Sequence, residues 1–429
     1  IKRLKTTIGE HGINIVGEPT PRAPLANQIV IGDVFPKETK DHIIIYNKKL
    51  KNEKVASLVA GGGIGGSALF RYLAEAKMKP VLINFDRGSS WRNIAGGRPA
   101  FSIPEIAEIA KQNLAIFKEL QEKANIDFKQ TRYVNFAHNE NVHITLEESI
   151  KWSNAYLVSP NQFKKEISSF INSNLSKLYI SALITKDCWQ ATPGKVIDLI
   201  RRIGIAHGGF INEDCQLIEV SKENNVYKAT VKTHNNEFIE YETPYFIKAL
   251  GPNGEQFARQ LNIDTGLYCV KHQAFITRRL PMLGLNGNPL DMLIDRRQYK
   301  GFSAVYGQQL AETGQIIGCA SPLNENIETS KNIKINSKDF LEIISEVFVT
   351  WIPLLSSVGF QAVWAGYYVE PRMIIDTELG LFLGLRGQGF MLAQYLAKLY
   401  VDKICNKTIP EYFIRLSLQG DGLPEKAFK

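Results

Sequence analysis

The sequence predicts an α/β protein with two lobes, one of which is a Rossmann-like nucleotide-binding lobe. Three observations lead to this prediction. The chain has 429 residues, which is more than a single hydrophobic core usually organises. A strand–turn–helix–strand unit with a glycine-rich turn runs from Val55 to Asp86. A second glycine-rich turn opens an apolar helix near the end of the chain, between Gly384 and Leu399.

The first glycine-rich turn has the surroundings that a dinucleotide-binding fingerprint requires. The apolar run "VASLVA" precedes "GGGIGG", the helically spaced "SALFRYLAEAKM" follows it, and "PVLINF" is the second strand. In this spacing the first glycine allows a tight turn, and the second lets the backbone approach a pyrophosphate. The third lets the helix pack closely on the strand. An acid twenty residues later can bind both hydroxyls of a ribose. The predicted contacts are Gly61, Gly63, Ile64, Gly65, Gly66 and Asp86. The alternative is a structural glycine turn with a solvated Asp86.

A second cluster of glycines and arginines follows directly, in "DRGSSWRNIAGGRPAF". It can run along a cofactor longer than NAD, past the pyrophosphate toward a ribityl chain and ring. The stretch resembles the second cofactor-binding segment of FAD-dependent oxidoreductases of the D-amino-acid oxidase type, which include glycine oxidase, sarcosine oxidase and dye-linked proline dehydrogenases. The resemblance implies FAD as the cofactor. It implies further contacts from Arg87, Arg92, Asn93, Gly96, Gly97 and Arg98.

The resemblance continues in order along the chain, from about Val55 to Lys407. It implies that "ALGP" passes beside FAD, with Ala249 and Gly251 in contact. It also implies that the second glycine turn returns to the flavin ring through Gly387, Gln388, Gly389, Phe390 and Met391. Backbone N–H groups and the positive end of a helix would stabilise the anionic reduced flavin there. The alternative is a glycine turn packed against a neighbouring strand.

The resemblance also implies how the lobes interleave. A Rossmann-like FAD-binding lobe is expected from residues 55–105, 190–260 and 365–407. A substrate lobe with a mixed or antiparallel sheet is expected from residues 106–189 and 261–364. Residues 1–50 are an N-terminal arm of unknown role, and residues 408–429 are a tail that could fold over the active site.

The substrate-binding residues are less well defined by the sequence. A substrate carboxylate would be held by a bidentate guanidinium. We assign Arg297 and Arg372 to this role, with Arg296 and Arg386 as alternatives, and we expect Tyr299 and Tyr367 to wall the pocket. Each of these arginines could instead be a surface or ion-pair residue, and each tyrosine could serve in packing.

Composition excludes several other classes. Hydrophobic residues make up 44% of the chain and charged residues 22%, as in ordinary globular proteins. The net charge of +8 is not gathered into a lysine–arginine tract, which argues against nucleic-acid binding. The five cysteines are widely spaced and form no CxxC pair, which argues against a disulfide framework and against a bound metal. We find no signal-peptide pattern and expect a cytoplasmic protein.

The expected reaction is FAD-dependent oxidation of a C–N bond in a small amine or amino acid, giving an imine that hydrolyses. The electrons would pass to oxygen, a quinone or a protein acceptor. The segment "WAGYYVEPRMIID" resembles that of dye-linked L-proline dehydrogenases. Two alternatives stay open: a 2-hydroxy-acid or glycerol-3-phosphate dehydrogenase, and an FAD-binding subunit of an electron-transfer complex. Peripheral association with a membrane or a complex is possible on either reading, as is a monomer or a homo-oligomer.

Overall fold

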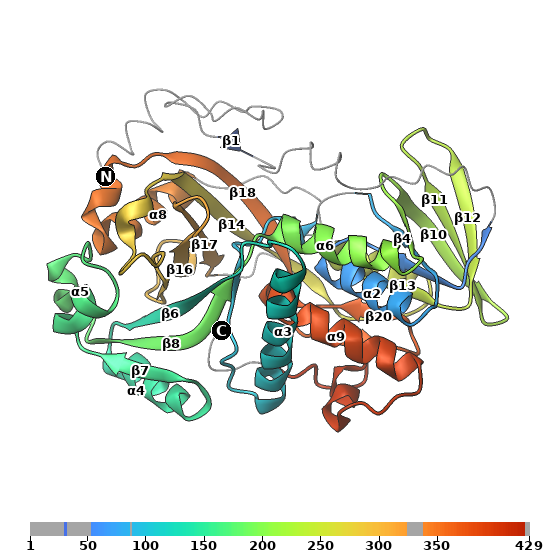
Figure 1. The fold of residues 1–429 in the computed structure, drawn as a ribbon, viewed down its shortest axis with the longest axis horizontal. Helices are drawn as coiled ribbons and strands as arrows, with labels where there is room; N and C mark the ends of the chain where they lie inside the picture. The colour runs from blue at the N-terminus through green and yellow to red at the C-terminus, as the bar shows by residue number, and fades with distance from the viewer. Residues whose placement is uncertain (1–29, 32–52, 86–87, 324–337, 425–429) are drawn as a thin grey trace.

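The computed structural model describes residues 30–31, 53–85, 88–323 and 338–424, which form three β-sheets and the helices that cover them (Figure 1). Apart from residues 30–31, the predicted arm of residues 1–50 lies outside the described residues, as do Asp86 and Arg87.

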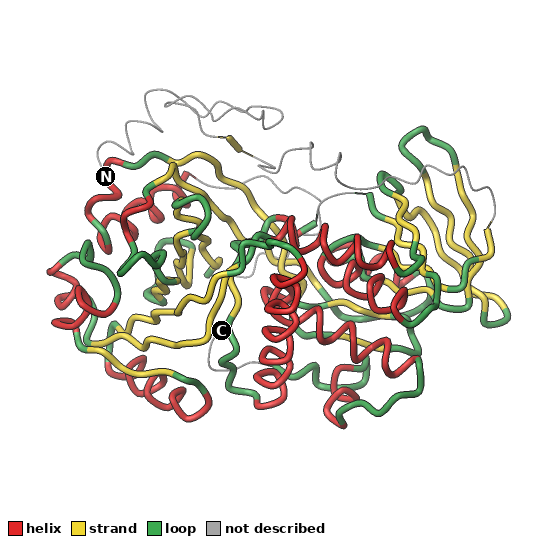
Figure 2. The backbone as a smooth tube through the Cα atoms, viewed as in Figure 1, coloured by secondary structure: helices red, strands yellow, loops and turns green. Residues whose placement is uncertain are grey.

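A six-stranded sheet with helices packed on it forms one side of the molecule (Figure 2). Five neighbouring strands are parallel and the sixth, β19, is antiparallel to β20. β3 and β4 are buried along their whole length, which explains why they read as continuous apolar runs. In spatial order the strands are β19 (Ile374–Asp376), β20 (Leu381–Leu383), β13 (Phe246–Lys248), β3 (Ser57–Ala60), β4 (Pro80–Ile83) and β9 (Phe210–Asn212).

Four helices share a hydrophobic core on this sheet. α2 packs against both α6 and α9, and α9 packs against α3. α3 and α6 each have a proline in the first turn. Proline lacks a backbone N–H, and in the first turn of a helix that N–H would make no helical hydrogen bond. The helices are α2 (Ile64–Glu75), α3 (Pro104–Lys123), α6 (Pro193–Ala206) and α9 (Gly389–Ile404).

A ten-stranded mixed sheet makes up the other half of the molecule. Its pairs are antiparallel except for β1 with β18 and β15 with β6. One face packs against α8 (Lys338–Trp351), where Phe348 and Trp351 are part of a second hydrophobic core. The strands are β1 (Val30–Ile31), β18 (Phe360–Glu370), β14 (Tyr268–Arg279), β17 (Gln315–Pro322), β16 (Phe302–Gln309), β15 (Met292–Asp295), β6 (Lys129–Ala137), β8 (Ser181–Gln190), β5 (Gly96–Gly97) and β7 (Ala155–Val158), the last on β8.

A third sheet of four strands flanks the six-stranded sheet (Figure 1). Its strands alternate buried and exposed residues because only one face is covered. The strands are β10 (Gln216–Glu223), β11 (Val226–Lys232), β12 (Phe238–Thr243) and β2 (Glu53–Lys54), and the remaining α-helices of the described residues are α4 (Glu140–Glu148), α5 (Phe163–Glu166) and α7 (Gly254–Arg259).

The predicted fold class is confirmed, but three segments pack differently from the predicted lobe boundaries. α3, which we assigned to the substrate lobe, belongs to the core of the six-stranded sheet because its apolar face meets α9. β5 and residues 365–370, which we assigned to the FAD-binding lobe, are strands of the ten-stranded sheet.

The described part of the C-terminal tail lies against the helices rather than over a cavity. Phe413, Leu416 and Leu423 are buried in the core that α3 and α9 share. This packing follows from their apolar side chains, which would otherwise face water.

Candidate active site

A cavity of about 890 Å³ lies between the six-stranded sheet and one face of the ten-stranded sheet. Both glycine turns line it, although more than three hundred residues separate them in the sequence. The predicted site residues that line this cavity are Gly61, Gly63, Ile64, Gly65, Arg92, Asn93, Gly96, Arg98, Ala249, Gly251, Tyr367, Gly387, Gln388, Gly389, Phe390 and Met391.

The first glycine turn joins β3 to α2 in the manner that its spacing predicts. Gly61 has a φ of +103°, a conformation that side chains other than glycine rarely adopt. A Cβ at Gly66 would overlap the carbonyl oxygen of Gly61, so this glycine serves close packing and does not itself line the cavity. At Gly63 a Cβ would meet only the Ser90 side chain, with its Oγ 2.9 Å away. The Ile64 N–H at the start of α2 donates to Ser90 Oγ over 2.9 Å.

A buried polar cluster that the sequence did not reveal supports this turn from behind. Arg201 of α6 is 2% exposed and donates to the carbonyl oxygen of Gly62 (2.5 Å) and to Ser67 Oγ (2.9 Å). The same guanidinium forms a 2.5 Å ion pair with Glu213. Asn84, at the end of β4, donates to Glu213 (2.7 Å) and accepts from the Gly62 N–H (3.0 Å). The turn is therefore held through both backbone groups of Gly62.

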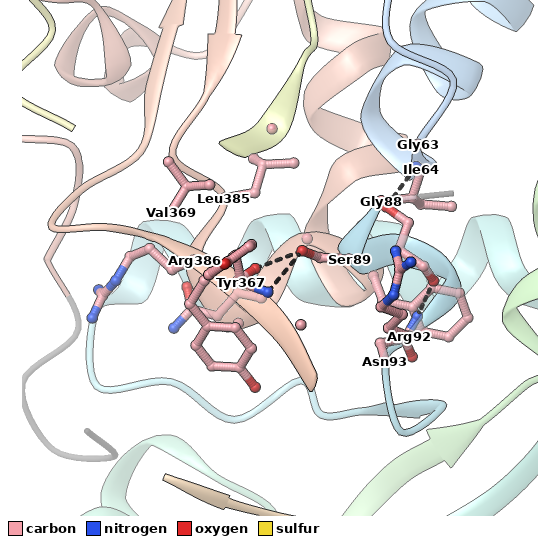
Figure 3. A pocket seen from close by; sticks show the side chains of 18 of the residues that line it. Gly63, Ile64, Gly88, Ser89, Arg92, Asn93, Tyr367, Val369, Leu385 and Arg386 are labelled. Carbon is pink, nitrogen blue, oxygen red and sulfur yellow. Dashed lines mark hydrogen bonds between the residues drawn. The ribbon is translucent and has the colours of Figure 1, made fainter. Parts of the chain in front are cut away.

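The second predicted segment is held to the ten-stranded sheet by Ser89, which the sequence did not single out. Ser89 Oγ donates to the carbonyl oxygen of Tyr367 (2.6 Å) and accepts from its N–H (3.2 Å), as Figure 3 shows. Asn93 donates to the carbonyl oxygen of Ser90 (2.6 Å) and accepts from the Ala95 N–H (2.7 Å). These bonds fix the loop that carries Arg92 along the cavity wall.

The second glycine turn presents the N-terminus of α9 to the cavity. A Cβ at Gly387 would overlap the ring of Tyr368, so the turn lies directly against β18. Arg386 forms a 2.7 Å ion pair with Glu370, and both side chains are largely buried. This arginine is therefore committed to a structural contact. The side-chain oxygen of Gln388 is buried and has no hydrogen-bond partner within the described part of the chain.

Alternate residues of the ten-stranded sheet form the opposite wall of the cavity. Successive side chains of a strand point to opposite faces, so every second residue faces the cavity while those between pack against α8. The cavity-facing side chains include Tyr133, Asn135, Val270, His272, Ala274, Met292, Ile294, Ala304, Tyr306, Cys319 and Ser321.

An aromatic cluster on this wall is uncharged at neutral pH. His272 stacks on Tyr368 with ring centres 3.7 Å apart, and the hydroxyls of Tyr306 and Tyr368 are 3.3 Å apart. Burial lowers the pKa of His272 to about 3 and raises the pKa of both tyrosines. The imidazole is therefore neutral, and its Nδ1 has no hydrogen-bond partner among the described residues.

Several predicted residues do not line the cavity. Arg297 pairs with Asp295 on the face of the sheet that packs on α8, and it also donates to Tyr299 (2.6 Å). Arg372 donates to backbone carbonyl oxygens of the C-terminal tail, at Leu418 (2.8 Å) and Gly420.

These positions correct the assignment of Arg297, Arg372 and Tyr299 to substrate. The arginine that does line the cavity is Arg296, directly after β15, because it has the same phase as Met292 and Ile294. Gly97 pairs with β8, and a Cβ there would overlap the ring of Trp189, so this glycine serves packing.

Residues 57–403 match the family model of FAD dependent oxidoreductases named DAO. The chain belongs to this family. FAD is therefore its cofactor and the protein is an oxidoreductase. No curated protein sequence matches the chain significantly.

Solved structures share the fold at low sequence identity. L-proline dehydrogenase from P. horikoshii has a TM-score of 0.73 and 23% identity over 86% of this chain and 97% of its own. Glycine oxidase from Bacillus cereus has a TM-score of 0.68 and 18% identity over 87% and 100%. L-alpha-glycerophosphate oxidase from Mycoplasma pneumoniae, solved with FAD bound, has a TM-score of 0.68 and 16% identity over 84% and 97%.

The residues of the DAO-family site fit FAD. The first glycine turn and the N-terminus of α2 line one end of the cavity, which continues from there to the N-terminus of α9. Two helix N-termini thus face one cavity, as expected for a cofactor with anionic groups at two places.

Neither a metal site nor a membrane-spanning helix is found among the described residues. No group of three or more His, Cys, Asp and Glu side chains in this part of the chain could hold a metal ion. Within the same ranges, no helix has both the length and the apolar character needed to cross a membrane.

Proposed function

We propose that this DAO-family protein oxidises a C–N bond in a small amine or amino acid. The observation that carries the proposal is the charge of the residues that line the cavity. Arg98 and Arg296 both line it, and the one carboxylate among its described lining residues, Glu370, is paired with Arg386. Such a cavity attracts a carboxylate and disfavours a cationic ammonium group.

The residues of the two glycine turns would hold the cofactor. The amides of the first turn and of the N-terminus of α2 would hold the pyrophosphate, and those of Gly387–Met391 would lie toward the flavin ring. When bound, FAD supplies the hydride acceptor for the reaction. Arg92 and Asn93 lie on the segment that runs between these two ends.

The remaining residues would bind and orient the substrate. The positive charge of Arg98 and Arg296 holds a carboxylate and favours the neutral form of the bound amine, from which a hydride leaves most readily. His272 stays neutral and can accept a hydrogen bond from that amine. Tyr367 and Tyr368 form the wall beside it. The imine product then hydrolyses in water to a carbonyl compound and an amine or ammonia.

L-proline is the first amine to test. The sequence around Tyr367 resembles that of dye-linked L-proline dehydrogenases, and the structure is similar to the L-proline dehydrogenase of P. horikoshii. A hydroxy acid or glycerol 3-phosphate is the second candidate, since the fold is also similar to a glycerophosphate oxidase.

The test is a reaction with matched amines and alcohols. The FAD-loaded protein is mixed with a redox dye and with L-proline, glycine, sarcosine, L-lactate or glycerol 3-phosphate. Carbonyl products are trapped with a hydrazine and identified by mass spectrometry. Dye reduction with an amine, and its carbonyl product, is the expected result. Reduction by lactate or glycerol 3-phosphate alone would overturn the proposal in favour of C–OH oxidation.

A further inference from the structure

Three polar side chains lie together on the cavity wall that the ten-stranded sheet forms. They are Tyr133 and Asn135 of β6 and Thr185 of β8. Tyr133 and Thr185 are paired across the two antiparallel strands, and Asn135 lies two residues further along β6. Residues placed in this way share one face of a sheet, with the Cβ atoms of an opposed pair about 4.5–5.5 Å apart. We call these three residues the polar patch.

The cavity ends beside the polar patch. One step further on the same face of the sheet, Ala137 and Leu183 pack against Leu146 of α4 and do not line the cavity. The neighbours of the patch on β15, Met292 and Ile294, are apolar. A ligand that reaches this end of the cavity therefore meets polar groups set among apolar ones.

The side chains of the polar patch are buried and have no protein partner. Their exposed fractions are 7% for Tyr133 and 3% for both Asn135 and Thr185. Asn135 Oδ1 has no hydrogen-bond partner within the described ranges. The hydroxyls of Tyr133 and Thr185 likewise make no hydrogen bond to the part of the chain that the structure describes. Burial raises the pKa of Tyr133, so its hydroxyl stays protonated and the patch carries no charge.

The chemistry of the polar patch favours an uncharged ligand group that both donates and accepts hydrogen bonds. Buried polar groups without partners are costly, and a bound group that pairs with them offsets that cost. A hydroxyl group can donate to the Asn135 carboxamide and accept from the hydroxyl of Tyr133 or Thr185. A carboxylate would offer acceptors only, an alkyl group would offer neither, and an ammonium group would find no opposite charge in the patch.

We propose that the polar patch binds a hydroxyl group of the substrate, away from the C–N bond that is oxidised. This inference rests on the proposed amine oxidation and narrows its substrate class to hydroxylated amino acids and small hydroxylated amines. The hydroxyl takes no part in the reaction. A hydride leaves carbon for FAD and a proton leaves nitrogen as the C=N bond forms, and water then hydrolyses the imine, so atoms and electrons balance.

Pairs of substrates that differ by one hydroxyl test the proposal. They are L-proline with cis- and trans-4-hydroxy-L-proline, L-alanine with L-serine, and N-ethylglycine with N-(2-hydroxyethyl)glycine, which place the hydroxyl at different distances from nitrogen. The FAD-loaded protein is assayed with a redox dye. In the best pair, we expect kcat/KM for the hydroxylated member to exceed that for the plain member by about 100-fold, because the plain member leaves buried polar groups unpaired.

Two valine variants on neighbouring strands locate the contact. Thr185→Val removes a hydroxyl from the cavity wall and is expected to lower the ratio of kcat/KM within the best pair by about tenfold. Thr131→Val is the matched control. Thr131 is also buried, its hydroxyl also lacks a partner among the described residues, and its side chain does not line the cavity, so the ratio should not change.

Asn135→Leu removes the amide of the polar patch with little change in volume. The same ratio is expected to fall by about 30-fold, through slower turnover of the hydroxylated member, while kcat/KM for the plain member does not fall. The variant breaks no hydrogen bond between described residues, so the melting temperature of the apoprotein should not fall either. A fluorescence titration should give the wild-type dissociation constant for FAD.

The outcomes separate this inference from the proposed function. Equal kcat/KM within every pair would overturn the inference and leave amine oxidation standing, as would a hydroxyl preference that survives both Asn135→Leu and Thr185→Val. Weaker FAD binding in these variants, with both members of each pair affected alike, would overturn it by assigning the polar patch to the cofactor. If no amine is oxidised and L-lactate is, the proposed function and this inference both fail.

Discussion

Replacing Arg201 with Met removes the support behind the first glycine turn. The guanidinium is 2% exposed and bonds Gly62, Ser67 and Glu213, so no water can replace it without rearrangement. Removing one partner of a buried ion pair costs about 3–5 kcal/mol. Glu213 keeps its 2.7 Å bond from Asn84, which places the expected loss at the lower end, about 3 kcal/mol.

The same change should weaken FAD binding. Without Arg201 the carbonyl oxygen of Gly62 loses its donor, and the adjacent N–H groups are no longer fixed toward the phosphate. We expect the dissociation constant for FAD to rise at least tenfold, which corresponds to about 1.4 kcal/mol. Urea unfolding of the apoprotein and a fluorescence titration with FAD measure the two effects separately.

The neighbouring Arg202 supplies the control. It lies on the same helix, is about half exposed and forms an i,i+4 pair with Asp198. Arg202→Met should cost less than about 0.5 kcal/mol and leave FAD binding unchanged. The reasoning is refuted if the free energy of unfolding of Arg201→Met lies within 1 kcal/mol of the wild-type value, or if Arg201→Met and Arg202→Met behave alike.

Three further predictions follow from other parts of the structure. Gly63→Val should block FAD loading, because its side chain would displace Ser90 from the Ile64 N–H at the start of α2. Gly66→Ala should instead destabilise the apoprotein, because its Cβ would overlap the carbonyl oxygen of Gly61. Thermal unfolding and flavin content distinguish the two variants, and a Gly63→Val protein with full flavin would contradict the first prediction. Burial lowers the pKa of Lys248 to about 7, below its usual 10.5, so the unfolded chain binds the extra proton between these values. Wild-type stability should therefore rise with pH by about 1.4 kcal/mol per unit from pH 7.5 to 9.5 relative to Lys248→Met, and equal slopes in urea unfolding would contradict this. Glu370→Gln leaves the buried Arg386 without its carboxylate, so it should lower the free energy of unfolding by about 3 kcal/mol and shift the flavin spectrum. An unchanged melting temperature would argue against a structural ion pair.

The first glycine turn was predictable because its signal is local. The strand, the turn and the start of the helix are contiguous, and Gly61 and Gly66 have the conformations and contacts that the spacing implies. The role of the second turn depended on the family resemblance, since nothing local shows that Gly387 meets the first turn across one cavity. The predicted contacts of Asp86 and Arg87 stay predictions.

The choice between Arg296 and Arg297 shows where sequence reasoning lost information. Strand phase is read from alternating polarity, but Met292, Leu293 and Ile294 are all apolar because both faces of β15 are covered. Nothing local then indicates which arginine faces the cavity. Only the pairing of β15 with β6 and β16 fixes the phase.

Other residues were missed because their partners are distant in the sequence. Arg201 lies within the apolar pattern of α6, where an arginine reads as a surface residue, and its partner Gly62 is 139 residues away. The packing of α3 on α9 brings together segments that are further apart still. Both features depend on contacts between distant residues, which local sequence patterns do not show.

The visible spectrum of the purified protein under anaerobic conditions tests the central claim most directly. The protein is examined as prepared, after loading with FAD, and after addition of L-proline, sarcosine and trans-4-hydroxy-L-proline in turn. We predict a flavin spectrum that loses its absorption near 450 nm on addition of an amine. A flavin that every amine leaves oxidised, but that a hydroxy acid bleaches, would contradict amine oxidation. A protein that takes up no FAD would contradict the account of both glycine turns.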